Sequence, residues 1–137
     1  MDPGVFLDTA ALVALLNQDE DDHAAATEMF TQFGRRGRRV VTTSFVLAEL
    51  GNVLARTTLR DKVVWLIKQL DGDPASKVVY VERAELTEAL ELYQTRTDKS
   101  WGLVDCVSFV TMQSMGIREA FTADRHFEQA GFVALLR

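Results

Sequence analysis

Short strand-like runs and helix-like runs alternate along the whole chain, and this alternation restricts the possible folds more than any other feature of the sequence. The strand-like runs are short, apolar and β-prone, and they lie at 4–7, 39–44, 77–82, 119–123 and 132–136. Helix-like composition or periodicity is found at 9–18, 22–33, 44–57, 59–72, 83–96, 103–116 and 124–131. The alternation predicts a three-layer α/β/α fold, with a central parallel sheet of four to five strands between two layers of helices.

Length and composition predict a single domain over residues 1–137. Of the 137 residues, 47% are hydrophobic, which is enough to form a core without disulfide bonds. Cys106 is the only cysteine, and this excludes internal disulfides and any cysteine-based metal site. No apolar run approaches the roughly 20 residues needed to cross a bilayer, and we find no signal peptide. We therefore expect a cytoplasmic protein without a membrane partner.

Four acidic residues are predicted to meet at one edge of the sheet. Asp8 ends the first strand and Asp124 follows the fourth, so both lie at the carboxyl edge, where such sheets bind ligands. Asp105 begins an otherwise apolar helix, and Glu49 lies within about two turns of the start of the helix that follows the second strand. Taken singly, each acid has an ordinary explanation, as a helix N-cap for Asp8 or Asp124 and as half of a salt bridge for the others.

Four carboxylates at one edge favour a site for divalent cations. Converging carboxylates repel one another, and a cation relieves that repulsion. Mg²⁺ and Mn²⁺ prefer such oxygen ligands, and one or two of them can activate water and stabilise the leaving oxygen of a phosphodiester. The formal net charge is −5, and these acids account for most of it, so the remaining surface is near neutral. An acidic balance therefore does not exclude a polyanionic substrate.

The motifs around these acids resemble those of a known family. "VFLDTAALVALLN", "VVTTSFVLAELGNVLAR", "DKSWGLVDCVSFVTM" and "AFTADRHFEQAGF" are together similar to the PIN-domain nucleases, and most of all to the VapC-type toxins and their stand-alone relatives. The resemblance implies a metal-dependent endoribonuclease with a PIN-like fold. Asp8, Glu49, Asp105 and Asp124 would be its catalytic metal ligands, for one or two Mg²⁺ or Mn²⁺ ions. It also implies an RNA substrate, a homodimer and, for a toxin, a cognate antitoxin.

The same resemblance suggests supporting residues. Thr9 and Thr122 match hydroxyl positions that support the acids or a metal-bound water, although turn and cap chemistry explains both equally well. Asp98 matches a recurrent acid, which we expect to cap the next helix or to lie behind the site. His126 is also recurrent, and we expect it to have a packing role because a metal-activated water needs no nearby base. Apart from this resemblance, the local sequence predicts that Ser44 caps the helix that it begins.

Basic, acidic and apolar runs allow further expectations. Lys99 and Arg125 flank the site motifs and are the candidates for phosphate contacts. The arginine-rich run at 34–39 precedes the second strand, which places it at the opposite edge as a solvated loop, and the acidic run at 19–22 is expected to be a polar loop. The helix at 59–72 either contributes to the core or forms, with the preceding helix, an apolar groove for a partner peptide.

Other functions fit less well. A receiver domain would need a pair of acids after the first strand and a lysine near the last one, and a haloacid-type phosphatase would need an acid at position 10, where alanine stands. The remaining alternatives are a stand-alone PIN nuclease in RNA processing and a non-catalytic binding module of the same fold. Cleavage of RNA with Mg²⁺ or Mn²⁺ separates the nucleases from the binding module.

Overall fold

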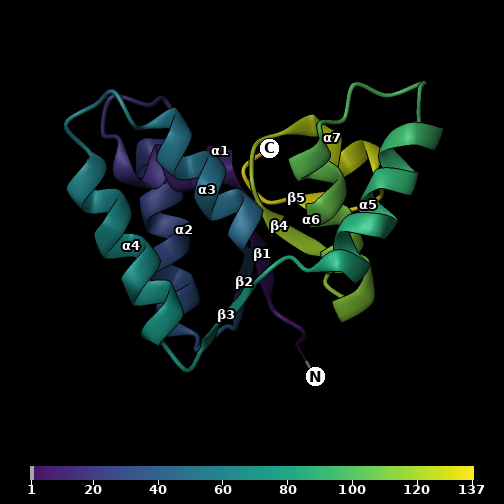
Figure 1. Ribbon diagram of the computed structural model, residues 1–137. Coiled ribbons are helices and arrows are strands. Elements are labelled where there is room, and N and C mark those ends of the chain that lie inside the picture. Colours follow the sequence, from purple (N-terminus) through teal and green to yellow (C-terminus); the bar gives the residue numbers. More distant parts are fainter. Residues whose placement is uncertain (1) are drawn as a thin grey trace.

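A five-stranded parallel sheet runs through the centre of the protein, as the computed structural model of residues 2–137 shows (Figure 1). The strands are β1 (Val5–Leu7), β2 (Val40–Thr43), β3 (Ser76–Val79), β4 (Glu119–Phe121) and β5 (Val133–Ala134). The helices are α1 (Thr9–Leu16), α2 (His23–Arg35), α3 (Ser44–Val53), α4 (Arg60–Gly72), α5 (Arg83–Thr95), α6 (Leu103–Met115) and α7 (Arg125–Gln129). The predicted order of strands and helices is confirmed, as is the α/β fold.

The order of the strands places a crevice beside β1. Along the sheet the order is β3-β2-β1-β4-β5, so the chain first moves outward from β1 in one direction and then returns to add β4 on the other side. Figure 1 shows α1 to α4 on one side of the sheet and α5 to α7 on the other. In parallel sheets, ligands bind where the strand order reverses, outside the carboxyl ends of the strands. Here that point lies between the ends of β1 and β4.

Aromatic side chains fix the short helix α7 against the strand and helix that carry the site. Phe127 is fully buried, and its ring centroid lies 6.3 Å from that of Phe6 in β1 and 5.0 Å from that of Phe109 in α6. Such offset and edge-on aromatic pairs add to the free energy gained by burying their area. One core residue therefore sets the position of α7 relative to both β1 and α6.

Gly4 allows the chain to approach β2 closely before β1 begins. Its φ is +107°, and a Cβ atom at this position would lie 2.7 Å from the backbone oxygen of Arg39. The next residue, Val5, donates a backbone hydrogen bond to that same oxygen. A residue with a side chain would be strained here in both conformation and space.

The expected N-cap of α3 differs from the structure. The N-cap of α3 is Thr43, whose hydroxyl accepts a hydrogen bond from the amide of Val46. Ser44 instead accepts a hydrogen bond from the amide of Val81, so its expected capping role is wrong and it ties α3 to the segment after β3.

Among residues 2–137, no helix is long and apolar enough to cross a membrane.

Candidate metal centre

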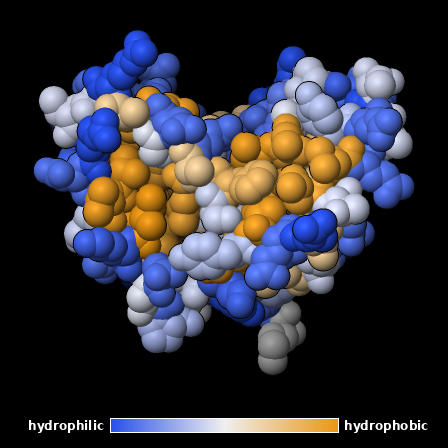
Figure 2. Space-filling view, in the orientation of Figure 1, coloured by the Kyte–Doolittle hydropathy of each residue, from blue (hydrophilic) through white to orange (hydrophobic). Residues whose placement is uncertain are grey.

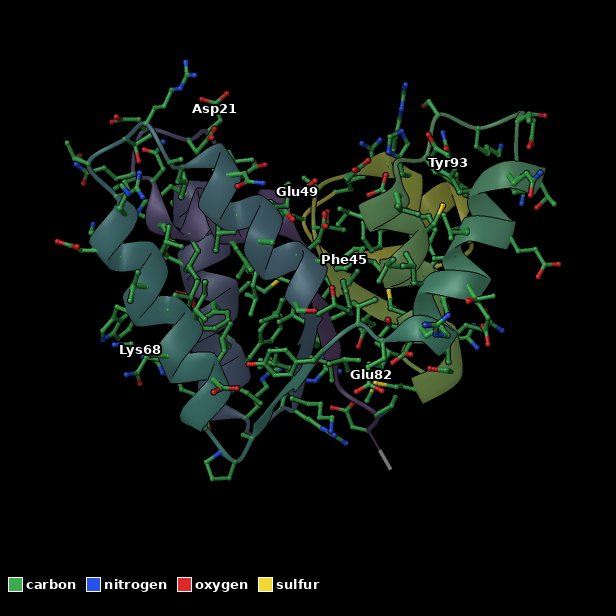
Figure 3. All side chains as sticks on the ribbon, in the orientation of Figure 1. Asp21, Phe45, Glu49, Lys68, Glu82 and Tyr93 are labelled. Atoms are coloured by element: carbon green, nitrogen blue, oxygen red, sulfur yellow. The ribbon has the colours of Figure 1, made fainter. Side chains whose placement is uncertain are left out.

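The four predicted acids meet at one cavity at the carboxyl ends of the strands. Asp8, Glu49, Asp105 and Asp124 all line it, and its volume is about 490 Å³. Asp8 follows β1, Asp124 follows β4, and the other two come from α3 and α6. Figure 3 shows Glu49 projecting from α3 toward the side of the molecule that carries α6 and α7. The folding topology thus brings together carboxylates from four separate parts of the chain.

Asp8 is the most buried of the four acids. Its exposed fraction is 4%, and one carboxylate oxygen accepts a hydrogen bond of 2.8 Å from the hydroxyl of Thr122. Burial raises the pKa of Asp8 to about 7, and the charges of Asp105 and Asp124 add to this rise, whereas the bond from Thr122 opposes it. Asp8 occupies the N-cap position of α1, but among the described residues its side chain makes no capping bond to that helix. Its N-cap explanation is therefore wrong.

Asp105 is held at the first turn of α6. Its Oδ2 atom accepts a hydrogen bond of 3.1 Å from the backbone amide of Gly102, the N-cap of that helix. Burial is the main cause of a raised pKa for Asp105, and the negative charge of Asp124 raises it further. For both Asp8 and Asp105, burial is the largest cause of the raised pKa.

Asp124 is both a helix cap and a member of this cluster. Its Oδ1 atom accepts a hydrogen bond of 2.9 Å from the amide of His126, which caps α7. Its own amide donates to the hydroxyl of Thr122, so that hydroxyl bonds to both Asp8 and Asp124. The capping explanation is therefore confirmed for Asp124, and the cap leaves the carboxylate facing the cavity.

The side chains around the cavity fit a divalent cation. Thr9 is only 6% exposed and lines the cavity, yet its hydroxyl has no hydrogen-bond partner among residues 2–137. A buried polar group of this kind calls for a partner outside the chain. Ligand atoms of Asp105, Asp124 and His126 all lie within 4.8 Å of one another, a grouping that can hold a metal ion. Oxygen-rich surroundings with raised carboxyl pKa values are typical of such centres.

Two features around the acids are absent from the sequence-based expectations. His126 was expected to have a packing role, but its Nδ1 atom lies 3.3 Å from both Asp105 and Asp124. The acidic run at 19–22 does form a loop, as expected, but Glu20, Asp21 and Asp22 also line the cavity. The sequence does contain a signal for His126, because it stands two residues after Asp124 in "DRHF". The position of the acidic loop, by contrast, depends on how α1 and α2 pack.

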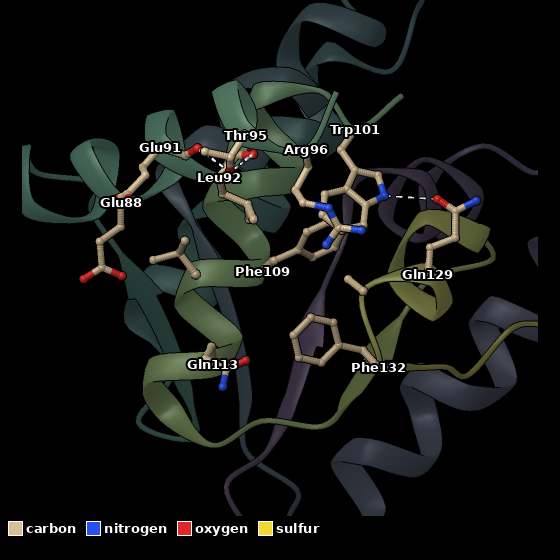
Figure 4. A pocket seen from close by; sticks show the side chains of 12 residues that line it. Glu88, Glu91, Leu92, Thr95, Arg96, Trp101, Phe109, Gln113, Gln129 and Phe132 are labelled. Atoms are coloured by element: carbon tan, nitrogen blue, oxygen red, sulfur yellow. Dashed lines mark hydrogen bonds between the residues drawn. The ribbon is translucent and has the colours of Figure 1, made fainter. Parts of the chain in front are cut away.

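Asp98 does not cap α6, so that expectation is wrong. Its carboxylate accepts two hydrogen bonds from Arg96, at 3.0 and 3.1 Å, and it is not among the residues that line the acidic cavity. The Arg96 guanidinium also lies 4.9 Å from the ring centroid of Trp101, and Trp101 donates a hydrogen bond to Gln129 (Figure 4). These contacts fix the segment between α5 and α6, in which the hydroxyl of Ser100 lies 3.2 Å from His126.

The basic residues singled out in the sequence differ in their pairing. Lys99 lies 4.0 Å from Asp98, at the limit of an ion pair, and Arg125 is exposed between two residues of the site. In the arginine-rich run at 34–39, Arg38 is not simply solvated, because it pairs with Asp2 and Glu119 at 2.8 Å each. It lies near the amino ends of the strands, and this agrees with the expectation that the run lies away from the acidic site.

A second cavity, of about 730 Å³, lies beside α4. Within α4, Val63, Leu66 and Leu70 belong to the core, as one of the two expectations for this helix had it, whereas Trp65 is 60% exposed. The sequence predicted that α3 would form the wall of this groove opposite α4. That prediction is wrong, because the apolar side chains that line the cavity opposite α4 belong to α1 and α2. Amphipathic periodicity identifies the apolar face of a helix but not the neighbour across from it.

Comparison with known proteins places these features in a family. The family model of the PIN domain matches residues 5–133. The chain belongs to the PIN-domain family.

Within this family the similarity is to VapC proteins. The "23S rRNA-specific endonuclease VapC20" of Mycobacterium tuberculosis is 32% identical over 132 residues, which cover 94% of this chain and 95% of that protein. "Ribonuclease VapC26" of the same organism is 27% identical over 124 residues, or 90% of this chain and 89% of that protein. The crystal structure of VapC20, described as a "Sarcin-Ricin loop cleaving toxin", superposes with a TM-score of 0.84 at 25% identity, covering 96% of this chain and 98% of that one. The chain is thus a VapC-type PIN-domain ribonuclease.

Proposed function

We propose that the protein is an endoribonuclease that acts in the cytoplasm with one or two Mg²⁺ or Mn²⁺ ions, and that it is the toxin of a toxin–antitoxin pair. The observation that carries the catalytic proposal is the meeting of Asp8, Glu49, Asp105 and Asp124 at one cavity. When bound there, a divalent cation would supply a Lewis acid for phosphodiester hydrolysis. Asp8, Asp105 and Asp124 are proposed to hold it, with Glu49 reaching from α3 as the fourth ligand.

The hydroxyl groups and basic side chains have proposed roles around these acids. Thr122 orients the carboxylate of Asp8 through its 2.8 Å hydrogen bond, and Thr9 offers an unpartnered hydroxyl, among the described residues, to the attacking water. Lys99 and Arg125 lie on the segments that flank the site, where they are suited to contact the phosphates of RNA. Asp98 supports Lys99 and Arg96 from behind the rim.

A cleavage assay tests the catalytic proposal. The first substrate is a hairpin RNA with the sarcin–ricin loop, because that loop is named for the similar toxin VapC20. We expect cutting with Mg²⁺ or Mn²⁺, none in EDTA, and a loss of about 100-fold or more in Asp8→Asn, Glu49→Gln, Asp105→Asn and Asp124→Asn. Glu88→Gln on α5 is the control. A protein that binds no divalent ion and cuts neither this hairpin nor bulk RNA would be a binding module instead.

Growth measurements test the toxin proposal. Expression of the chain alone is expected to slow growth, and Asp105→Ala is expected to relieve that effect because it removes one of the cavity's carboxylates. Normal growth during production of active wild-type enzyme would instead favour a stand-alone nuclease in RNA processing. Sequencing of the 5′ ends of the cut transcripts would identify the RNA target in either case.

The groove beside α4 is the proposed site of the antitoxin. It combines the exposed ring of Trp65 with Leu15 of α1 and Phe30 and Phe33 of α2, an apolar lining suited to the apolar face of a partner helix. Trp65 is exposed and Trp101, the other tryptophan, is buried, so a bound segment should shift the emission of Trp65 to shorter wavelength. We expect Trp65→Ser to weaken binding of the adjacent gene's product without changing RNA cleavage.

We also propose that two copies of the chain form a homodimer. Figure 2 shows two apolar areas on one face of the molecule, separated near its centre. The helices at the front in Figure 1 carry exposed apolar side chains, among them Val53 of α3, Val64 of α4 and Leu90 of α5. Exposed apolar areas of this kind are typical of a protein interface. Sedimentation analysis should give a dimer for the wild type and a monomer for Val53→Glu/Leu90→Glu.

A further inference from the structure

The imidazole of His126 lies between two carboxylates of the candidate metal centre. Its Nδ1 atom is 3.3 Å from Oδ2 of Asp105 and 3.3 Å from Oδ1 of Asp124. This nitrogen is buried, and no atom of the described residues 2–137 makes a hydrogen bond with it. Both contacts fall short of hydrogen-bond geometry, which requires the N–H to point at its acceptor. These three potential ligand atoms lie within 4.8 Å of one another.

The other nitrogen of the ring is held from outside the cavity. Nε2 of His126 lies 3.2 Å from the hydroxyl of Ser100, in the segment that the contacts of Trp101 fix. A metal-binding histidine usually donates its second N–H to such a partner, and this bond leaves the first nitrogen free as a ligand. In the tautomer in which Nε2 donates to Ser100, Nδ1 offers its lone pair toward Asp105 and Asp124.

The backbone also restricts the position of the ring. The amide of His126 donates a hydrogen bond of 2.9 Å to Asp124, and the next residue, Phe127, is anchored in the core. The imidazole is therefore oriented by two hydrogen bonds and by the buried neighbour Phe127 before any ligand binds. Preorientation of this kind reduces the entropy cost of binding a metal.

From this geometry we infer that Nδ1 of His126 is a ligand of the cation held by Asp105 and Asp124, and that it gives the site a preference for Mn²⁺ over Mg²⁺. This inference rests on the metal centre proposed above. Neighbouring ligands in an octahedral shell with bonds of about 2.1 Å lie about 3 Å apart, close to the 3.3 Å separations here. Imidazole binds transition metals well, whereas Mg²⁺ takes oxygen ligands and water.

Metal titration and pulsed electron paramagnetic resonance test the inference on the wild-type chain and on His126→Leu. By calorimetry we expect this variant to bind Mn²⁺ about tenfold more weakly or worse, with a change of less than about threefold for Mg²⁺. The spectra of the Mn²⁺-loaded wild type should contain a directly coordinated nitrogen, which should change its coupling on ¹⁵N-histidine labelling and vanish in His126→Leu.

His23→Gln is the matched control, because the chain has only two histidines and His23 bonds to the backbone oxygen of Ala14 on α1. It should keep the nitrogen signal. His126→Gln tests whether loss of binding reflects misfolding, since it retains a polar side chain of similar length and should lose the imidazole signal while keeping its melting temperature.

The outcomes separate this inference from the proposed function. Mn²⁺ bound without a histidine nitrogen, together with equal affinities in His126→Leu, would overturn the role of His126 and leave the acidic metal centre intact. A wild-type chain that binds neither Mn²⁺ nor Mg²⁺ would overturn the metal centre itself.

Discussion

Thr122 donates a 2.8 Å hydrogen bond to the carboxylate of Asp8 and accepts a 3.0 Å hydrogen bond from the amide of Asp124. A single buried hydroxyl thus joins the acid that follows β1 to the acid that follows β4. The two strands are neighbours in the sheet. The two hydrogen bonds of Thr122 therefore set the distance between Asp8 and Asp124, two of the proposed ligands.

Thr122→Val should therefore damage the metal centre more than it damages the fold. We expect a loss of about 1–2 kcal/mol in the free energy of unfolding and a fall of roughly 10- to 100-fold in metal affinity and RNA cleavage. Thr42→Val is the matched control, since the hydroxyl of Thr42 is also buried but bonds to the backbone oxygen of Leu7. It should cost similar stability and leave metal affinity unchanged. Equal metal affinities in the two variants would contradict the role of Thr122.

The stability of the metal-free protein should decrease as pH rises from about 4 to about 7. The pKa of Asp8 is raised from 3.8 to about 7 in the fold, so over this range the folded protein keeps a proton that the unfolded chain releases. The free energy of unfolding then falls with pH, by a few kcal/mol at most. Thermal melting in EDTA should show this slope in the wild type. Asp8→Asn should reduce the slope and melt above the wild type at pH 8, and equal slopes would refute the assignment.

Neutralising the acidic loop should strengthen RNA binding. Glu20, Asp21 and Asp22 are exposed, line the cavity, and face the polyanion that the site is proposed to cut. Replacing them with Gln, Asn and Asn should lower the KM for RNA roughly threefold at low salt, with the difference lost at high salt because screening removes it. The same change of net charge on α5, made by replacing Glu85, Glu88 and Glu91 with Gln, should have a smaller effect. Equal KM values for the two triple variants would argue against local repulsion.

Gly4→Ala should destabilise the fold by about 2 kcal/mol or more. The positive φ of Gly4 opposes a side chain, and so does the backbone oxygen of Arg39, which would lie only 2.7 Å from a Cβ atom at this position. Gly34→Ala, within α2 and with open space around it, should instead gain about 0.5–1 kcal/mol. Urea unfolding at constant slope measures both changes. A neutral Gly4→Ala would mean that β1 can shift away from Arg39.

The fold and the convergence of the four acids could both be predicted from the sequence, for one physical reason. Parallel strands end at the same edge, so an acid directly after β1 and another after β4 share that edge, and the adjacency of these two strands brings the acids together. The acids on α3 and α6 follow because each lies within the first turns of its helix. These inferences need only periodicity and topology.

Features that depend on packing could not be predicted in this way. The position of His126 depends on where Phe127 inserts in the core, and the failure of Asp98 to cap α6 depends on its pairing with Arg96 and the stacking of Arg96 on Trp101. The wall of the groove opposite α4 likewise depends on how the helices pack against one another. Local sequence patterns contain no information about such long-range choices.

Residues 124–127 place a proposed ligand, a proposed phosphate contact, an imidazole and a core anchor in four successive positions. Each residue of a helix is turned by about 100° from the one before it. A single inserted or deleted residue here would therefore rotate the imidazole away from Asp105 or pull the phenyl ring out of the interior. The fold should tolerate many replacements of Arg125, at the expense of the proposed phosphate contact, but it should tolerate no change in the length of this tetrapeptide.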